Sequence, residues 1–438
     1  MNEEHSRLAL RGGSKHVRSD PGEMFTWPIV TEEDEQAVLD VLRQRKMSAT
    51  DITKQFEREF AEWMGAAYAL GTCNGSAGLL AAMWACGVGA GDEIICPSMT
   101  YWASALPALS LGAAVHFADI DPETLCLDPK DIEHRICEKT KAIVVVHYAG
   151  HPCDMDRILP IARKYGIKVI EDVSHAQGSL YKGRICGTLG DIGVMSLMTG
   201  KSFAVGEAGM SVTNDRHLYE RCVAFGHYER TGAFSRFNPP DKQVTDPELA
   251  EYAGVPLGGC KHRMNQSCSA MGRVQLKYYP ERINEIQKSL NYFWDLLEGL
   301  PGIKPHRPAK DLGRTTMGGW YYPQGLYRAE ELGGLSCEKF CEAVRAEGVS
   351  NCYPGGNDPL HLHPVFHRAD VFNMGKPTML AFGQRDVRQG KGALPVSERI
   401  HEISVSIPWF KHYRSAIIEE YAGAFRKVVE KSSCITGE

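Results

Sequence analysis

The sequence lacks the cysteine arrangements that bind metals or cross-link small secreted domains. Its 14 cysteines are scattered over 438 residues, without a Cys-x-x-Cys pair or a paired cysteine and histidine cluster. Cys337 and Cys341 lie in a segment with a helical pattern, which favours packing over metal binding. The polar start Met1-Asn-Glu-Glu-His is unlike a secretory signal. We therefore expect reduced thiols, no metal site and a cytoplasmic location.

The sequence also lacks the long apolar runs of membrane-spanning segments and the basic tracts of nucleic-acid-binding proteins. No apolar run approaches the ~20 residues that cross a bilayer. The formal net charge is −5 and no long basic tract is present, which argues against binding to nucleic acid. Hydrophobic residues make up 43% and charged residues 24%, as in an ordinary globular protein. A chain of this length forms two or three domains, or one large enzyme with an appended domain.

Short apolar strands alternate with helices through the first half of the chain. Residues 31–45 are predicted to form a helix that Thr31 can cap, and a second amphipathic helix is predicted at residues 54–64. Residues 76–86 are Ala-rich and apolar, which predicts a buried helix. Further strands are predicted at 93–96, 115–118, 142–147, 169–171, 192–197 and 210–213, with a helix at 154–165. This alternation predicts an α/β fold with a mainly parallel sheet covered on both faces.

The second half has a different pattern. Residues 228–258 are polar and contain Pro239-Pro240, which predicts a long functional loop. Residues 265–299 predict one long helix, with Pro280 as the point where it could break. Strands around Trp320-Tyr-Tyr and helices at 337–347 and 413–430 complete a smaller α+β domain. We expect an N-terminal arm (1–30), a large domain (31–264), and a connecting helix with a small C-terminal domain (265–438).

One lysine and one aspartate suggest a specific chemistry. Lys201 follows a predicted strand in Ser196-Leu-Met-Thr-Gly-Lys201, and Asp172 ends the apolar strand that begins at Lys168. Enzymes that use pyridoxal 5′-phosphate need a lysine amine for a Schiff base and an acid that keeps the pyridine nitrogen protonated. A lone lysine is most often a solvated surface residue, so the prediction depends on the residues around it.

Several neighbouring segments fit this chemistry, although each also has an ordinary structural interpretation. Asn74-Gly75-Ser76 opens a helix and could bind phosphate, or it could only cap that helix. Tyr101 follows a strand and could stack on a flat ring, or it could be a core aromatic. His175 could lie beside the ring or simply be packed. Ser196 could bind phosphate or be a solvated loop residue.

Taken in order, these segments resemble the DegT/DnrJ/EryC1/StrS family of pyridoxal-phosphate-dependent sugar aminotransferases. The resemblance covers roughly residues 27–412. Its pieces, in chain order, are Asn74-Gly75-Ser76, Pro97-Ser98-Met99-Thr100-Tyr101, Asp119-Ile-Asp121, His147-Tyr-Ala-Gly, Glu171-Asp172-x-x-His175, Gly190-Asp-Ile-Gly, and Lys201 with Gly206-Glu207. It implies the aspartate-aminotransferase-like fold type I, with a seven-stranded sheet in a large pyridoxal-phosphate-binding domain and a smaller C-terminal α+β domain.

The resemblance also implies a role for each site residue. Lys201 would carry the cofactor, Asp172 would pair with the pyridinium nitrogen, and His175 would lie near the ring hydroxyl. Tyr101 would stack on the ring, where relatives often use Phe or Trp. The phosphate would be held by Gly75, Ser76 and Ser196. Relatives are homodimers whose partner supplies another phosphate contact, and the matching segment here places Lys261 where asparagine is usual.

A narrower resemblance concerns the substrate. The segment from Leu8 to Lys15, with Trp27-Pro28, and the segments 361–366 and 394–399 look like glutamine-dependent keto-inositol aminotransferases of aminoglycoside antibiotic pathways. It implies an aminotransferase that passes an amine from L-glutamine or L-glutamate, through pyridoxamine 5′-phosphate, to a keto-cyclitol similar to scyllo-inosose or to a keto-sugar. The alternatives are a nucleotide-linked keto-sugar aminotransferase, a sugar dehydratase, and a non-catalytic regulator. Family dehydratases have histidine in place of the lysine.

Overall fold

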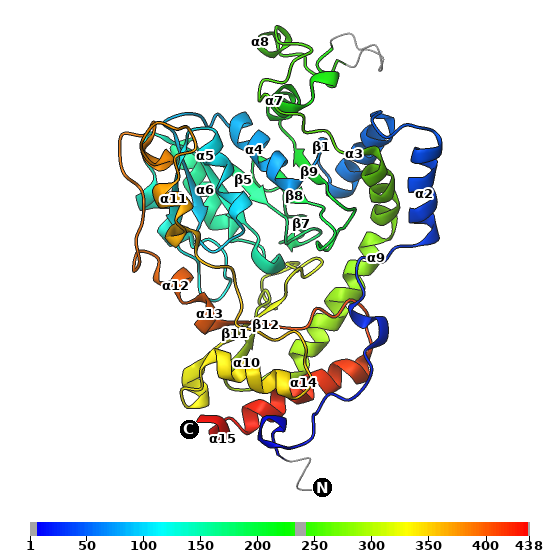
Figure 1. Cartoon of the computed structure of the whole chain (residues 1–438), viewed down its shortest axis with the longest axis vertical. Helices are drawn as coiled ribbons and strands as arrows, with labels where there is room; N and C mark the ends of the chain where they lie inside the picture. The colour runs from blue at the N-terminus through cyan, green and yellow to red at the C-terminus, as the bar shows by residue number, and fades with distance from the viewer. Residues whose placement is uncertain (1–6, 233–241, 437–438) are drawn as a thin grey trace.

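The chain is built around one seven-stranded sheet, which lies in the upper half of the molecule in Figure 1. The computed structural model describes residues 7–232 and 242–436. The strand order is β1-β9-β8-β5-β4-β2-β3. The strands are β1 Tyr68–Thr72, β2 Glu93–Pro97, β3 Ala114–Ala118, β4 Thr140–Val146, β5 Lys168–Asp172, β8 Ile192–Ser196 and β9 Gly209–Thr213. The neighbours from β8 to β3 pair in parallel, and β9 pairs antiparallel with β8 and β1, so the predicted mainly parallel sheet is confirmed.

The helices form where the capping and periodicity signals predict them. Thr31 accepts a hydrogen bond from the Asp34 N–H, and the Asp34 side chain accepts one from the Thr31 N–H, which closes a capping box. The larger helices are α2 Glu32–Arg43, α3 Asp51–Met64, α4 Gly75–Ala85, α6 Met155–Tyr165, α7 Arg216–Gly226, α9 Gln266–Leu296, α10 Cys337–Ala346 and α14 Ser415–Glu430. Helix α4 is apolar on all sides and packs against β8 and β9, as a buried helix should.

Shorter elements fill the connections. The one-turn α-helices are α5 Pro107–Ser110, α8 Pro247–Ala250, α11 Val365–Arg368, α12 Pro395–Glu398, α13 Ile400–Ile403 and α15 Ser433–Thr436. The 3₁₀ turns are η1 Ala9–Arg11, η2 Gly22–Phe25, η3 Trp102–Ser104, η4 Pro129–Asp131, η5 Glu133–Arg135, η6 Tyr148–Gly150, η7 Tyr228–Arg230, η8 Ala329–Leu332, η9 Leu360–Leu362 and η10 Thr378–Leu380. Part of the predicted loop 228–258 therefore has helical turns, and residues 233–241 of it lie outside the described residues.

The small C-terminal sheet is antiparallel, in the order β10-β11-β12, and a two-stranded hairpin lies elsewhere in the chain. Its strands are β10 Ile303–Pro305, β11 Gln324–Tyr327 and β12 Ser404–Ser406, and the hairpin pairs β6 Leu180–Tyr181 with β7 Arg184–Ile185. The predicted strand at Trp320-Tyr-Tyr is wrong. Trp320 and Tyr322 have φ angles of 50° and 55°, so the chain makes a left-handed turn there before β11 begins.

Helix α9 joins the two halves of the molecule and continues through Pro280, so the possible break there does not occur (Figure 1). Proline removes one backbone hydrogen bond from a helix, a cost that packing can offset. Before the proline, α9 packs on α2 and α3, and the Gln275 side chain donates to Asp34 at 2.8 Å. After it, α9 packs on α14, and the Tyr292 hydroxyl donates to Glu419 at 2.6 Å. Tertiary contacts therefore hold the helix on both sides of the proline.

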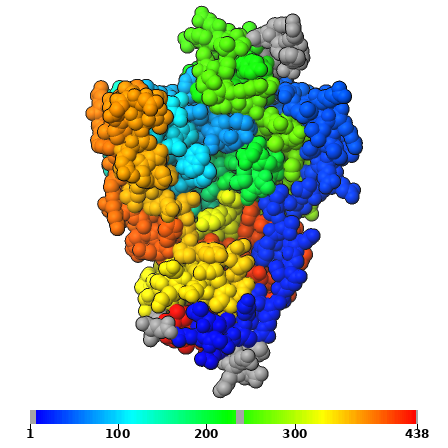
Figure 2. Space-filling view, in the orientation of Figure 1, coloured from blue at the N-terminus to red at the C-terminus, as the bar shows by residue number. Residues whose placement is uncertain are grey.

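Two clusters of buried apolar side chains form the core. The first surrounds the main sheet and includes residues from the late segment 360–400, such as Phe366 and Leu394. The second lies around α10 and α14 and includes Leu8, Val17 and Met24 of the N-terminal arm. Figure 2 shows the blue arm against the yellow part of the small domain, and the orange segment against the cyan sheet region. The domain boundaries of the sequence analysis stay a prediction. No helix among the described residues is long and apolar enough to cross a membrane.

Candidate functional site

A cavity of about 590 Å³ lies at the carboxyl edge of the main sheet. Asp172 and Ser196 are the last residues of β5 and β8, and Gly75 starts α4. Side chains that follow parallel strands meet at this edge, where ligands of open α/β sheets bind. The lining residues are Asn74, Gly75, Ser76, Leu79, Thr100, Tyr101, Trp102, Ala103, Val146, Asp172, Ser174, His175, Ser196, Met198, Lys201, Glu207, Tyr321, Tyr322 and Asn357.

The beginning of α4 forms one wall of the cavity. Asn74 caps the helix, with its side-chain oxygen accepting the Ala77 N–H at 2.8 Å. A Cβ on Gly75 would lie 2.9 Å from the Cβ of Ser196, so only glycine lets this turn approach the end of β8 so closely. The first N–H groups of a helix have no intrahelical partner and favour an anion. Gly75, Ser76 and Ser196 thus meet at a place suited to phosphate.

Asp172 is buried, with 5% of its surface exposed, and it faces the cavity. Its Oδ2 accepts a hydrogen bond from the Ser104 hydroxyl at 2.7 Å, and its Oδ1 accepts the Ser174 N–H at 3.0 Å. The Ser104 hydroxyl also contacts the Thr100 hydroxyl at 2.9 Å. These neutral donors orient the carboxylate without neutralising its charge, so it can pair with a cationic ring nitrogen.

Lys201 lies in the loop between β8 and β9 and is 9% exposed. Burial lowers the pKa of its amine to about 8, and the charge of Asp172 partly opposes this shift. Desolvation disfavours the ammonium form. The Nζ atom lies 4.1 Å from the ring centre of Tyr321. Near neutral pH the free-amine fraction of this lysine is therefore far larger than that of an ordinary lysine, which favours its use as a nucleophile or base.

His175 and Tyr101 both line the cavity but differ in exposure. His175 is buried, and burial together with the charge of Lys201 places its pKa well below the usual value, so the ring is neutral. The Ala149 N–H donates to its Nδ1 at 3.4 Å. Tyr101 is 50% exposed, and its ring centre is 5.0 Å from that of Trp102. The ring-stacking role of Tyr101 stays a prediction.

Lys261 is the predicted site residue that the structure does not bring to the cavity of its own chain. It is exposed, and its Nζ lies 5.9 Å from the ring centre of Tyr228. The segment around it lies beside the α4 turn, because the Cys73 N–H donates to the His262 carbonyl at 2.6 Å. Its role in the site of a partner subunit stays a prediction.

Sequence reasoning missed several residues that shape the site. Ser104 holds Asp172, and Trp27 donates a hydrogen bond to the Lys201 carbonyl at 2.8 Å. Asn357 reaches the cavity from the C-terminal part of the chain and accepts a hydrogen bond from the Tyr148 hydroxyl at 2.7 Å. Tyr321 enters through a turn that was predicted as a strand. The end of a predicted strand indicated Asp172 from the sequence. No local sequence pattern indicates the other contacts, because they join residues that lie far apart in the chain.

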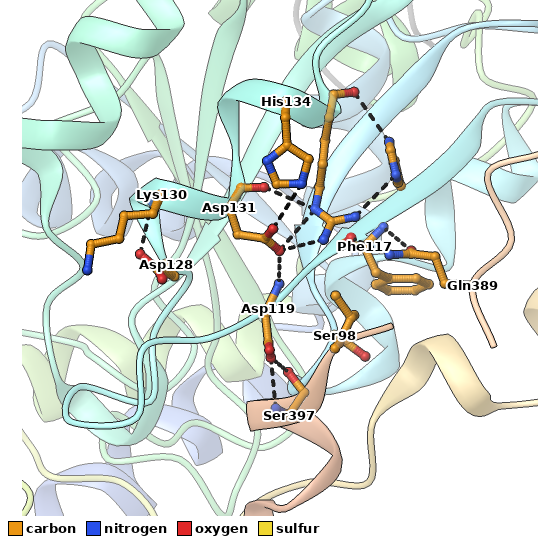
Figure 3. Close-up of polar contacts among 12 residues, drawn as sticks. Ser98, Phe117, Asp119, Asp128, Lys130, Asp131, His134, Gln389 and Ser397 are labelled. Carbon is orange, nitrogen blue, oxygen red and sulfur yellow. Dashed lines mark hydrogen bonds and ion pairs between the residues drawn. The ribbon is translucent and has the colours of Figure 1, made fainter. Parts of the chain in front are cut away.

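The late segment around Ser397 is fastened to the sheet through Asp119 (Figure 3). The Asp119 carboxylate accepts hydrogen bonds from the Ser397 hydroxyl at 2.6 Å and the Ser397 N–H at 2.8 Å. The side chain of Gln389 pairs with the backbone of Phe117 in both directions at 2.9 Å. Asp119 and Ser397, each part of a motif quoted for the resemblances, therefore join the late segment to the β3 edge of the sheet.

The residues present fit pyridoxal phosphate. One cavity brings together a buried amine, a buried carboxylate and a helix N-terminus held open by glycine. Among the described residues, no group of three or more histidine, cysteine, aspartate or glutamate side chains could hold a metal ion.

Comparisons with known proteins agree with this geometry. Residues 28–425 match the DegT/DnrJ/EryC1/StrS aminotransferase family. The chain is 31% identical over 438 residues to the L-glutamine:2-deoxy-scyllo-inosose aminotransferase of Streptomyces kanamyceticus, covering 97% of both chains. It is 34% identical over 341 residues to the GDP-perosamine synthase of Escherichia coli O157:H7, covering 77% of this chain and 88% of the synthase.

A solved structure confirms the predicted fold type I. The aminotransferase from Psychrobacter cryohalolentis superimposes with a TM-score of 0.79 at 27% identity, over 93% of this chain and 99% of that protein.

Proposed function

This chain belongs to the DegT/DnrJ/EryC1/StrS aminotransferase family, and from that premise we propose that it transfers an amine from L-glutamine to a keto-cyclitol similar to scyllo-inosose. It is an aminotransferase that depends on pyridoxal phosphate. The cyclitol is supported by several relatives named for scyllo-inosose derivatives, including one from Streptomyces griseus that is 30% identical over 436 residues. Their names also specify L-glutamine as donor. L-glutamate is the alternative donor, and a keto-sugar is the alternative acceptor.

The observation that carries the proposal is the joint placement of Lys201 and Asp172 in one cavity beside the start of α4. When bound, the cofactor supplies an aldehyde that exchanges amines and a ring that accepts electrons. Lys201 would anchor it and move a proton between its C4′ atom and the substrate carbon. Asp172 would keep the ring nitrogen protonated, and His175 would lie near the ring hydroxyl. The α4 turn with Ser76 and Ser196 would hold the phosphate, and Tyr101 would cover the ring.

Three alternatives use the same fold. GDP-perosamine synthase is named for a product with a nucleotide-linked sugar, so a nucleotide-linked keto-sugar is the second candidate substrate. A dehydratase of this family would have histidine at position 201, and lysine is present. A non-catalytic regulator would bind the cofactor without converting it.

Assembly and location form part of the proposal. We propose a homodimer in which Lys261 reaches the partner's phosphate site, because a lysine is suited to a phosphate dianion as a point charge. All 14 cysteines are free, which supports the cytoplasm as the place of action. The net charge of −5 speaks against nucleic acid as a partner. Neither a membrane nor a metal is part of the proposed activity.

The test has two stages. Purified protein loaded with pyridoxal phosphate is mixed with L-glutamine or L-glutamate, and the loss of the pyridoxal absorbance band is followed, with the Lys201→Ala variant as control. The amine-loaded protein is then given scyllo-inosose, 2-deoxy-scyllo-inosose or a nucleotide-linked 4-keto-sugar, and the products are identified by mass spectrometry. Amination of a cyclitol supports the proposal. Failure of the first stage would favour the regulator, and amination of only the nucleotide-linked sugar would favour the second substrate class.

A further inference from the structure

The backbone of Lys201 is held by the N-terminal arm. The indole N–H of Trp27 donates to the Lys201 carbonyl at 2.8 Å, although the two residues are far apart in the sequence. The Lys201 N–H in turn donates to the Met198 carbonyl at 2.8 Å. Both sides of the residue are therefore fixed, and the side chain leaves a rigid position.

The side chain of Lys201 ends over an aromatic ring. Its Nζ lies 4.1 Å from the ring centre of Tyr321. Among the described residues, no carboxylate forms an ion pair with this amine; Asp172 acts on it only through longer-range charge. The other titratable side chains that line the cavity are His175, Glu207 and the tyrosines at positions 101 and 322. The face of an aromatic ring attracts an ammonium group, most strongly where water is excluded.

The Tyr321 ring is held firmly. Its centre lies 5.7 Å from that of Trp409 in a T-shaped pair, and 4.8 Å from the His175 ring. Trp409 also contacts Trp27, with ring centres 5.7 Å apart, and its indole N–H donates to the Gly319 carbonyl at 3.0 Å. The column Trp27–Trp409–Tyr321 thus joins the N-terminal arm to the amine.

The turn that carries Tyr321 packs closely against the residue that follows Lys201. A Cβ on Gly319 would lie 2.3 Å from the Cβ of Ser202, the residue after Lys201. Trp320 and Tyr322 on either side of Tyr321 have left-handed φ angles, which non-glycine residues rarely adopt. Such backbone outliers concentrate at functional sites. This strained turn places the Tyr321 ring over the amine of Lys201.

We propose that the face of Tyr321 holds the ε-ammonium group of Lys201 whenever this nitrogen is protonated and not bonded to the cofactor. The proton that Lys201 takes up during amine transfer then stays on Nζ, over the ring, until it is delivered to the other carbon. Trp27 and Trp409 are positioning residues for this arrangement. The proposal rests on the proposed function, because it assigns Lys201 as the proton carrier.

The test compares Tyr321→Leu, which removes the ring, with the matched control Tyr321→Phe, which keeps the ring face and removes only the hydroxyl. Full-length protein is loaded with pyridoxamine 5′-phosphate, so that Lys201 is not covalently bound. The rate at which acetic anhydride labels Lys201 is measured across pH by peptide mass spectrometry, and its midpoint reports the pKa of the amine. Cofactor retention and circular dichroism establish that each variant is folded.

Loss of the ring should lower this pKa by about one unit, because a desolvated cation–π contact of this kind is lost. The Tyr321→Phe midpoint should stay within about 0.3 units of the wild type. An unchanged midpoint in Tyr321→Leu, or an equal shift in Tyr321→Phe, would overturn the proposal. The labelling needs no turnover, so a midpoint shift in a protein that fails to take amine from glutamine would refute the proposed function alone.

Discussion

Asp172→Asn isolates the charge of one carboxylate with little change in shape. The asparagine Oδ1 can still accept the Ser174 N–H, which donates to Asp172 at 3.0 Å. The hydroxyl of Ser104, now 2.7 Å from Asp172 Oδ2, can rotate and accept from the new amide. The buried network therefore stays satisfied, and we expect the variant to fold and to bind the cofactor.

The Asp172→Asn variant should be slow in amine transfer. An amide supplies no negative charge, so the proton on the pyridine nitrogen is no longer stabilised. Loss of one preorganised electrostatic partner costs ~10²–10³ in rate, or about 2.7–4 kcal/mol, by analogy with a single oxyanion-hole donor. We expect a loss of that size in Asp172→Asn.

The assay is the single-turnover reaction with L-glutamine, followed by the absorbance of the bound cofactor. Ser104→Ala is the matched control, because it removes one hydrogen bond to Asp172 and leaves the charge in place. Its rate should fall by less than about tenfold, since the carboxylate itself is still present and only one neutral hydrogen bond to it is lost. A loss under about tenfold in Asp172→Asn itself, with the cofactor retained, would show that the ring nitrogen has another partner.

Three further predictions concern the two lysines. Lys201→Ala should retain the cofactor through its phosphate and ring contacts but lose turnover, which equilibrium dialysis and product analysis would check; near-normal turnover would contradict the assignment. The amine-loaded wild type should react faster with its keto acceptor as pH rises through about 8, because burial lowers the pKa of Lys201 to about 8 and the free amine is the base; a rate independent of pH across this range would argue against that role. Mixing Lys201→Ala with Lys261→Ala should restore part of the activity, since a mixed dimer has one site with both defects and one with neither. Exchange of a tagged subunit must be shown first, and confirmed mixed dimers without activity would mean that Lys261 does not act across the interface.

The sequence by itself determined the parts of the fold and site that depend on neighbouring residues. Hydrophobic periodicity and caps predicted the alternating strands and helices, because burial of one face and satisfaction of helix ends are local requirements. The same logic placed Asp172 at a strand end and Gly75 and Ser76 at a helix start. Strand β1 was missed, since Tyr68–Thr72 is short and carries no distinctive alternation.

Only the tertiary structure decided the contacts that join distant segments. Helix α9 passes through Pro280 because packing on both sides offsets the lost hydrogen bond. Tyr321 reaches Lys201 through a left-handed turn whose form depends on a glycine packed against Ser202. Trp27 contacts the carbonyl of Lys201 although the two residues lie 174 positions apart in the sequence. Such contacts depend on the shape of the assembled core, and a linear pattern holds information only about residues a few positions apart.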